Sequence, residues 1–202
     1  MSLDIDRQRL SRRRLMAMGF GGAILVAAAA VWLLDAPRQT ASMIGGPFDL
    51  TSGDGVPVSD KSFPGQYLLV YFGYTSCPDV CPTTLSDEAD ALQKLGAQGN
   101  RVQPLFITID PRRDTPAVVK QYVAAFSPRL IGLTGTAGQI AAVARAYRVY
   151  YAPHVTGPGP DDYTMDHSSI LYLMAPGGQF VAPIRADQDG PAMAADILRH
   201  LT

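Results

Sequence analysis

An apolar run followed at once by a turn with two cysteines and then a helix constrains this chain more than any other feature. Residues 67–74 (YLLVYFGY) are rich in β-forming side chains, which predicts a strand buried on both faces. The next turn holds Cys77 and Cys81, and residues 82–98 carry apolar side chains at helical spacing. This order places both cysteines where a strand ends, at the edge of a sheet.

Apolar runs alternate with segments of helical period along the rest of the chain. Further strands are predicted at 102–110, 130–133, 168–174 and 179–184, and further helices at 115–126, 136–147 and 191–201. Residues 151–166 hold several prolines and glycines and are predicted to form a long loop. The pattern predicts an α/β domain whose central mixed sheet is flanked by helices, in the order typical of a thioredoxin-like fold.

The N-terminal segment points to a membrane. Arginines crowd into residues 1–14, and residues 15–34 carry no charge over a length that spans about 30 Å as a helix. The positive-inside bias predicts a single-pass anchor in a bacterial-type inner membrane, with the later domain in the periplasm. A cleaved signal peptide and twin-arginine export are the alternatives. We expect residues 35–46 to be a linker and residues 47–202 to form the functional domain.

The charge balance argues against one large class of partners. The chain has 17 basic and 18 acidic side chains, for a formal net charge of −1. Five of the basic residues lie before residue 15, which leaves the domain mildly acidic. Because nucleic-acid binding needs clustered Lys and Arg, we expect no nucleic-acid partner.

Two cysteines in an exported domain most often form a structural disulfide. Only three residues separate Cys77 from Cys81, so such a bond would stabilise the fold by roughly 2 kcal/mol. Their place at a strand-to-helix turn favours a redox-active dithiol or a metal site instead. If the helix begins at Pro82, Cys81 lies at its cap and is predicted to be the more acidic thiol. If the helix begins earlier, the two sulfurs still converge.

Two thiolates are soft donors, which select Cu(I) or Zn(II) and need a third ligand. His167 is the best candidate, because it precedes a predicted strand at the same sheet edge, whereas His154 lies in the long loop and His200 near the C-terminus. Asp79, inside the turn, is predicted either to add an oxygen to oxidised copper or to hydrogen-bond the turn. Asp166 is predicted to orient the imidazole or to cap the loop.

Four motifs in this order resemble the Sco/SenC family. Their sequences are GYTSCPDVCPTTL at 73–85, IDPRRDTP at 109–116, GLTGT at 132–136 and DYTMDHS at 162–168. The resemblance implies a membrane-anchored, thioredoxin-like copper protein that assists assembly of the dinuclear copper centre in subunit II of cytochrome c oxidase. By position, Cys77, Cys81 and His167 match the family's ligands for copper, taken as Cu(I) or Cu(II).

The implied metallochaperone delivers copper to subunit II, keeps the cysteines of that subunit reduced, or does both. Other periplasmic copper chaperones and a thioredoxin-like reductant that reopens the Cys77–Cys81 disulfide are further expected partners. The alternatives are an enzyme, namely a thiol–disulfide reductase without metal delivery, a copper or redox sensor, and a peroxiredoxin-type peroxidase, which leaves His167 unexplained. The sequence of residues 110–116 predicts a capped strand-to-helix turn. The second interpretation of this segment is a surface that docks a partner.

Overall fold

The computed structural model describes residues 44–201. The basic segment predicted at 1–14, the membrane span predicted at 15–34 and most of the predicted linker at 35–46 lie outside these residues. Within residues 44–201, no helix combines the length and the hydropathy needed to cross a bilayer.

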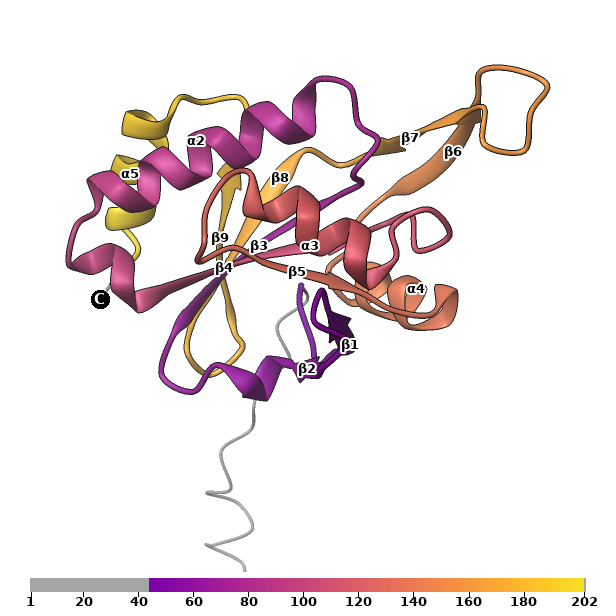
Figure 1. Ribbon diagram of the computed structural model, residues 1–202. Coiled ribbons are helices and arrows are strands. Elements are labelled where there is room, and N and C mark those ends of the chain that lie inside the picture. The colour runs from indigo at the N-terminus through magenta and orange to yellow at the C-terminus, as the bar shows by residue number, and fades with distance from the viewer. Residues whose placement is uncertain (1–43, 202) are drawn as a thin grey trace, which may run out of the picture. The chain divides into compact units, whose positions relative to one another are not determined.

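A mixed sheet of seven strands forms the centre of the described domain, in the order β2-β1-β5-β4-β3-β8-β9 (Figure 1). The strands are β1 Asp49–Ser52, β2 Pro57–Ser59, β3 Tyr67–Gly73, β4 Val102–Thr108, β5 Ile131–Thr134, β8 Ile170–Met174 and β9 Phe180–Arg185. β3, β4 and β5 run parallel, whereas β8 is antiparallel to β3. Every residue of β3 is buried, which explains its uninterrupted apolar sequence.

Helices cover both faces of this sheet. They are α2 Val80–Lys94, α3 Pro116–Ala124, α4 Ala137–Ala146 and α5 Gly190–Leu198, with short 3₁₀ helices η1 Asp60–Ser62 and η2 Gln98–Arg101. Successive side chains of β3 point to opposite faces: Tyr71 contacts Cys81 in α2, and Phe72 packs against Tyr147 just after α4. α2 and α5 pack together (Figure 1). The predicted helix-flanked mixed sheet is confirmed, with a strand order that fits the thioredoxin-like fold.

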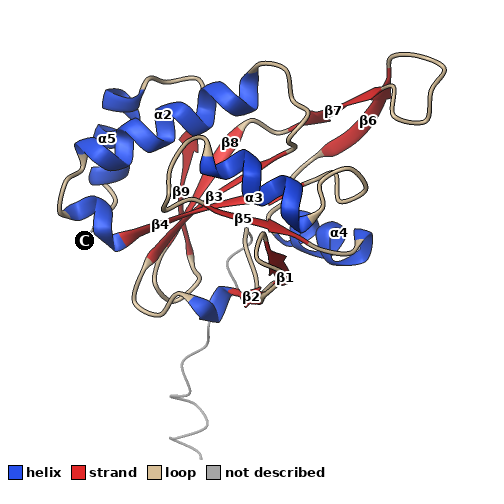
Figure 2. Cartoon of the chain, viewed as in Figure 1, coloured by secondary structure: helices blue, strands red, loops and turns tan. Residues whose placement is uncertain are grey.

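The prediction of a long loop at 151–166 is wrong. These residues form most of a hairpin with strands β6 Tyr151–Val155 and β7 Tyr163–His167, drawn as the outlying pair of arrows in Figure 2. The strands pair antiparallel from Tyr151↔His167 to Val155↔Tyr163. Pro153 argues against a strand when the sequence is considered alone. The proline is tolerated in β6 because this strand has a partner on only one side.

Two further differences concern the bounds of α2 and the presence of two short strands. α2 begins at Val80, two residues before the start predicted from Pro82, and ends at Lys94 rather than near residue 98. The short strands β1 and β2 were not predicted, because each is too brief to show a clear alternation of apolar and polar residues.

Candidate metal centre

The turn after β3 brings Cys77 and Cys81 together at the start of α2. Because α2 begins at Val80, Cys77 precedes the helix and Cys81 lies in its first turn. The backbone N–H of Cys81 donates to Sγ of Cys77 at 3.4 Å, so that sulfur occupies the amide-rich N-terminus of the helix. Both cysteines are free thiols, Cys77 half-buried and Cys81 fully buried. One sulfur is therefore accessible, and the other is anchored in the core.

Gly73, the last residue of β3, leaves room for the buried sulfur. A Cβ at this position would lie 2.9 Å from Sγ of Cys81 and 2.9 Å from a ring carbon of Phe106. The hydroxyl of Tyr71 donates a hydrogen bond to the same sulfur at 3.7 Å. The end of β3 thus fixes the Cys81 sulfur sterically and by a hydrogen bond.

His167 is the last residue of β7, and its imidazole lies next to the Cys81 sulfur. Its Nε2 lies 3.5 Å from Sγ of Cys81, and its Nδ1 lies 3.0 Å from the carbonyl oxygen of Ser168. A carbonyl only accepts, so Nδ1 carries the proton and the lone pair on Nε2 faces the sulfurs. The rings of Tyr71 and Tyr74 pack edge-on against the imidazole, with centroids 6.2 and 6.1 Å away.

These three residues form a compact donor set. Within residues 44–201, the ligand atoms of Cys77, Cys81 and His167 all lie within 4.8 Å of one another. Two sulfurs and one imidazole nitrogen suit soft or borderline ions such as Cu(I) and Zn(II), and not Mg²⁺ or Ca²⁺. The structure therefore brings together the three side chains that the sequence singled out, in a set that fits copper chemically.

The other candidate residues lie apart from this set. Asp79 is the exposed N-cap residue of α2, and its side chain makes no capping hydrogen bond. Asp166 is exposed and, as the neighbour of His167 in a strand, points to the opposite face of β7. The carbonyl of Ser168 takes the orienting role predicted for Asp166. His154 lies in β6, and His200 follows α5.

The relative acidity of the two thiols is the reverse of the sequence-based prediction. A hydrogen bond from the Cys81 side chain, together with bonds from backbone amides, holds the pKa of Cys77 well below its ordinary value. Donating that bond, together with burial, raises the pKa of Cys81. The prediction assumed a helix start at Pro82; the earlier start puts the Cys77 sulfur where amides stabilise a thiolate.

Sequence reasoning missed the residues that support the site. Tyr71, Tyr74 and the carbonyl of Ser168 fix the sulfur and the imidazole. The two tyrosines lie at the end of the strand that leads into the cysteine turn, and this position was the signal available in the sequence.

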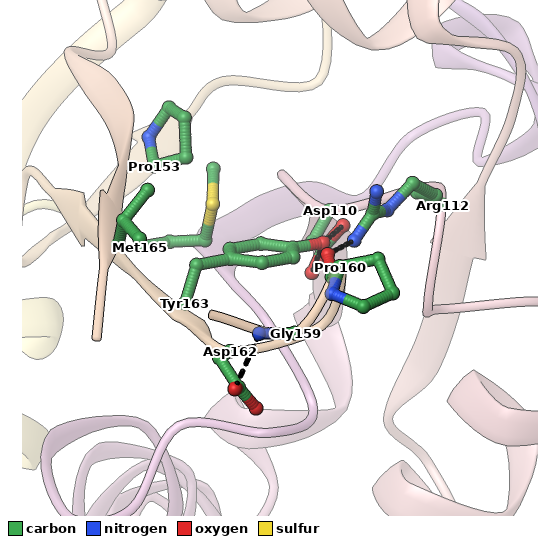
Figure 3. A pocket seen from close by; sticks show the side chains of 9 residues that line it. Asp110, Arg112, Pro153, Gly159, Pro160, Asp162, Tyr163 and Met165 are labelled. Carbon is green, nitrogen blue, oxygen red and sulfur yellow. Dashed lines mark hydrogen bonds between the residues drawn. The ribbon is translucent and has the colours of Figure 1, made fainter. Parts of the chain in front are cut away.

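A pocket of about 320 Å³ lies between residues 110–112 and the β6–β7 hairpin (Figure 3). It is lined by Asp110, Arg112, Pro153, Val155, Gly159, Pro160, Asp162, Tyr163 and Met165. None of the three donor residues lines it. Met165, which could also supply a soft ligand, is buried within the core cluster.

Comparisons with known proteins agree with this geometry. A family model described as SCO1/SenC matches residues 36–202. The human protein named "Protein SCO1 homolog, mitochondrial" is 45% identical over 167 residues, a match that covers 79% of this chain and 53% of the human protein. The chain spans about half the length of the human and mouse relatives.

Two solved structures add detail. Copper-bound ScoI from Bradyrhizobium japonicum is 46% identical with a TM-score of 0.70, over 78% of this chain and 99% of that chain. BsSco is described as having a disulfide switch and as a member of the Sco family of cytochrome c oxidase assembly proteins. It is 25% identical with a TM-score of 0.61, over 81% of this chain and 94% of that chain.

Proposed function

Because the chain belongs to the SCO1/SenC family, we propose that it binds copper through Cys77, Cys81 and His167 and serves in the assembly of cytochrome c oxidase. The observation that carries this proposal is the meeting of two sulfurs and one imidazole nitrogen within 4.8 Å. Copper bound to the Bradyrhizobium relative and the oxidase-assembly role of the family that includes BsSco support it.

In this proposal copper is cargo for the dinuclear centre of oxidase subunit II. The buried Cys81 and the oriented His167 retain the ion, while the half-buried Cys77 is the ligand that an incoming client cysteine replaces first. The uncharged segment at 15–34 supports a membrane anchor, which would hold the domain on the periplasmic side beside a membrane-bound client.

Copper binding is tested with the purified, reduced protein. We expect one copper ion per chain, a large loss of affinity in Cys77→Ser and in Cys81→Ser, and a smaller loss in His167→Ala. His154→Ala is a matched control, because His154 is an exposed histidine on the same hairpin and is expected to change nothing. Tight copper binding retained by both cysteine variants would refute the site.

One observation favours a second function, thiol–disulfide reduction. Cys77 is accessible and its pKa is low, while Cys81 lies next to it as a thiol. The Cys77 thiolate would attack a client disulfide and release one client thiolate. Cys81 would then lose its proton and attack Cys77 sulfur, which releases the second client thiol and leaves a Cys77–Cys81 disulfide. A thioredoxin-like dithiol would return the two electrons.

Delivery and reduction differ in their dependence on His167. Copper-loaded protein is mixed with reduced, metal-free subunit II, and separately metal-free protein is mixed with the oxidised subunit. Delivery predicts copper transfer in the first mixture that His167→Ala impairs. Reduction predicts that the client disulfide is lost in the second mixture, and that His167→Ala does not slow this loss. A sensor predicts neither, and cells lacking the protein would still assemble the oxidase copper centre.

A further inference from the structure

The loop between β4 and α3, residues 110–114, contacts both halves of the candidate metal centre. It belongs to the IDPRRDTP motif, whose role the donor set alone does not explain. On one side it meets the turn that carries the cysteines, and on the other it meets the hairpin that ends at His167.

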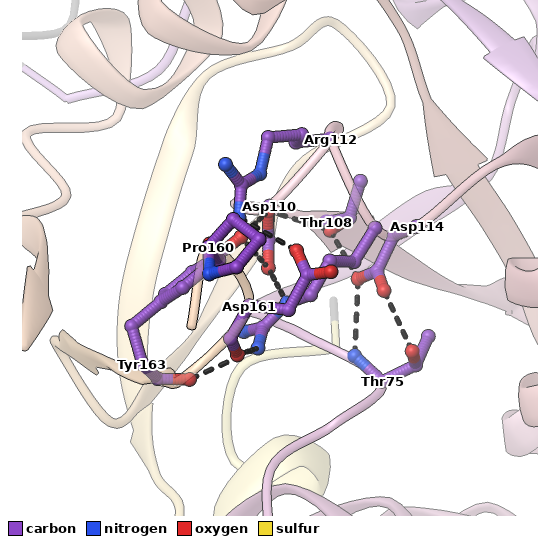
Figure 4. Close-up of polar contacts among 9 residues, drawn as sticks. Thr75, Thr108, Asp110, Arg112, Asp114, Pro160, Asp161 and Tyr163 are labelled. Carbon is purple, nitrogen blue, oxygen red and sulfur yellow. Dashed lines mark hydrogen bonds and ion pairs between the residues drawn. The ribbon is translucent and has the colours of Figure 1, made fainter. Parts of the chain in front are cut away.

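The contact with the cysteine turn is made by Asp114. This carboxylate is fully buried and accepts hydrogen bonds from the backbone N–H of Thr75 at 3.0 Å and from its hydroxyl at 2.6 Å (Figure 4). The hydroxyl of Thr108 at the end of β4 also donates to it. Because Thr75 precedes Cys77 by two residues, Asp114 ties the start of the cysteine turn to β4.

The contact with the hairpin is made by Asp110 and Arg113. Arg113 Nε donates to Asp110, and Arg113 Nη1 donates to the carbonyls of Tyr163 at 2.9 Å and Asp161 at 3.2 Å. The Tyr163 hydroxyl donates to Asp110 at 2.9 Å. The guanidinium also lies over the Tyr163 ring, 3.7 Å from its centroid. Both charged side chains are mostly buried, 17% and 5% exposed for Arg113 and Asp110.

Further contacts with the hairpin come from Arg112 of the same loop, which bonds the Pro160 carbonyl and Asp161, and from Met165 of β7, which packs into the core. In the described part of the chain, β6 and β7 pair with each other in a separate sheet of two strands (Figure 1). A lone hairpin of two strands is only marginally stable in water. Tyr163 begins β7 and His167 ends it, so the contact at Tyr163 fixes the strand that carries the imidazole.

We propose that Arg113 and Asp110 are positioning residues that hold His167 against the dithiol through Tyr163. This inference rests on the proposed copper site. If the contact between residues 110–113 and the hairpin is lost, the two sulfurs still bind copper, but the imidazole is no longer held beside them before copper binds. Substituting a residue that orients a metal ligand commonly lowers metal affinity by about 10–100-fold. We expect a loss of that size for Arg113→Gln.

A double-mutant cycle tests this inference on the purified full-length chain, with Cu(I) affinity measured against a chromophoric Cu(I) chelator. Arg113→Gln is expected to weaken binding about 10–100-fold in the wild-type background and to have almost no effect in the His167→Ala background. Tyr163→Phe removes only the hydroxyl bonded to Asp110, preserves the ring, and is expected to act in the same direction by a smaller factor.

Arg129→Gln is the matched control. Arg129 is also a partly buried arginine that donates to backbone carbonyls, those of Gly99 and Val102, but Val102 begins β4 whereas the metal centre lies beyond its other end. We expect Arg129→Gln to lower stability and to leave copper affinity unchanged. Hydrogen exchange of the metal-free protein adds a second readout: the β6–β7 amides should exchange faster in Arg113→Gln and at the wild-type rate in Arg129→Gln.

The inference is overturned if Arg113→Gln weakens copper binding equally with and without His167, or if it changes neither affinity nor hairpin exchange. A wild-type protein that fails to bind copper would contradict the proposed function instead. In that case hairpin exchange in Arg113→Gln still decides the positioning role, with faster exchange supporting it and unchanged exchange refuting it.

Discussion

Replacing Glu88 by Met is predicted to stabilise the domain. Glu88 lies in α2 with 1% of its surface exposed, and neither carboxyl oxygen has a hydrogen-bond partner among residues 44–201. A buried polar group without a partner costs about 1–3 kcal/mol, and Met fills a similar volume without polar oxygens. We expect the free energy of unfolding to rise by about 1–3 kcal/mol, and the Tm by roughly 2–12 °C for a domain of this size.

The gain should depend on pH. Burial raises the pKa of Glu88 well above its ordinary value, so the folded state retains a proton that the unfolded chain loses near pH 4.3. The folded wild type therefore loses stability as the pH rises from the unfolded pKa towards the folded one. Below the unfolded pKa this contribution vanishes, so the advantage of Glu88→Met should be smallest in acid and grow towards neutral pH.

Urea unfolding followed by circular dichroism between pH 4 and pH 8 measures both effects. Gln93→Met serves as the control, because Gln93 is exposed on the same helix and gains the same side chain without removing a buried carboxyl. The reasoning is refuted if Glu88→Met is no more stable than Gln93→Met, or if its advantage is the same at every pH.

Three other substitutions test the support around the sulfurs. Gly73→Ala puts a methyl group 2.9 Å from Sγ of Cys81, and should destabilise the fold by about 1–3 kcal/mol in urea unfolding and weaken copper binding; an unchanged midpoint would contradict the steric argument. Asp114→Asn disrupts a fully buried acceptor of hydrogen bonds and should lower stability by about 1–3 kcal/mol, whereas Asp54→Asn in an exposed ion pair should have little effect. Tyr71→Phe removes the donor to the Cys81 sulfur and should shift the sulfur-to-copper charge-transfer band of the Cu(II)-loaded protein; an unshifted band would show that this bond does not reach the metal.

The central strands and the cysteine turn could be predicted because local sequence determines them. β3 and β4 are apolar along nearly their whole length, a pattern that burial in the middle of a sheet requires. The place of His167 just before β8 follows from the same pattern. These elements bring the three donors to one sheet edge, so the choice of donors needed no knowledge of side-chain contacts.

The hairpin and the order of thiol acidity could not be predicted, because both depend on contacts between distant segments. β6 contains Pro153, and the turn between β6 and β7 holds two more prolines. The position of the hairpin depends on contacts with Arg113 and Asp110, about fifty residues earlier. The low pKa of Cys77 depends on a hydrogen bond from the Cys81 side chain and on where α2 begins. Local spacing does not encode either arrangement.

X-ray absorption at the copper edge tests the central claim most directly, because it reports the atoms bound to the metal. For the reduced, Cu(I)-loaded protein we predict two sulfur ligands and one imidazole nitrogen, with the nitrogen lost in His167→Ala and one sulfur lost in Cys77→Ser. A first shell without sulfur, or one unchanged by all three substitutions at Cys77, Cys81 and His167, would contradict the account.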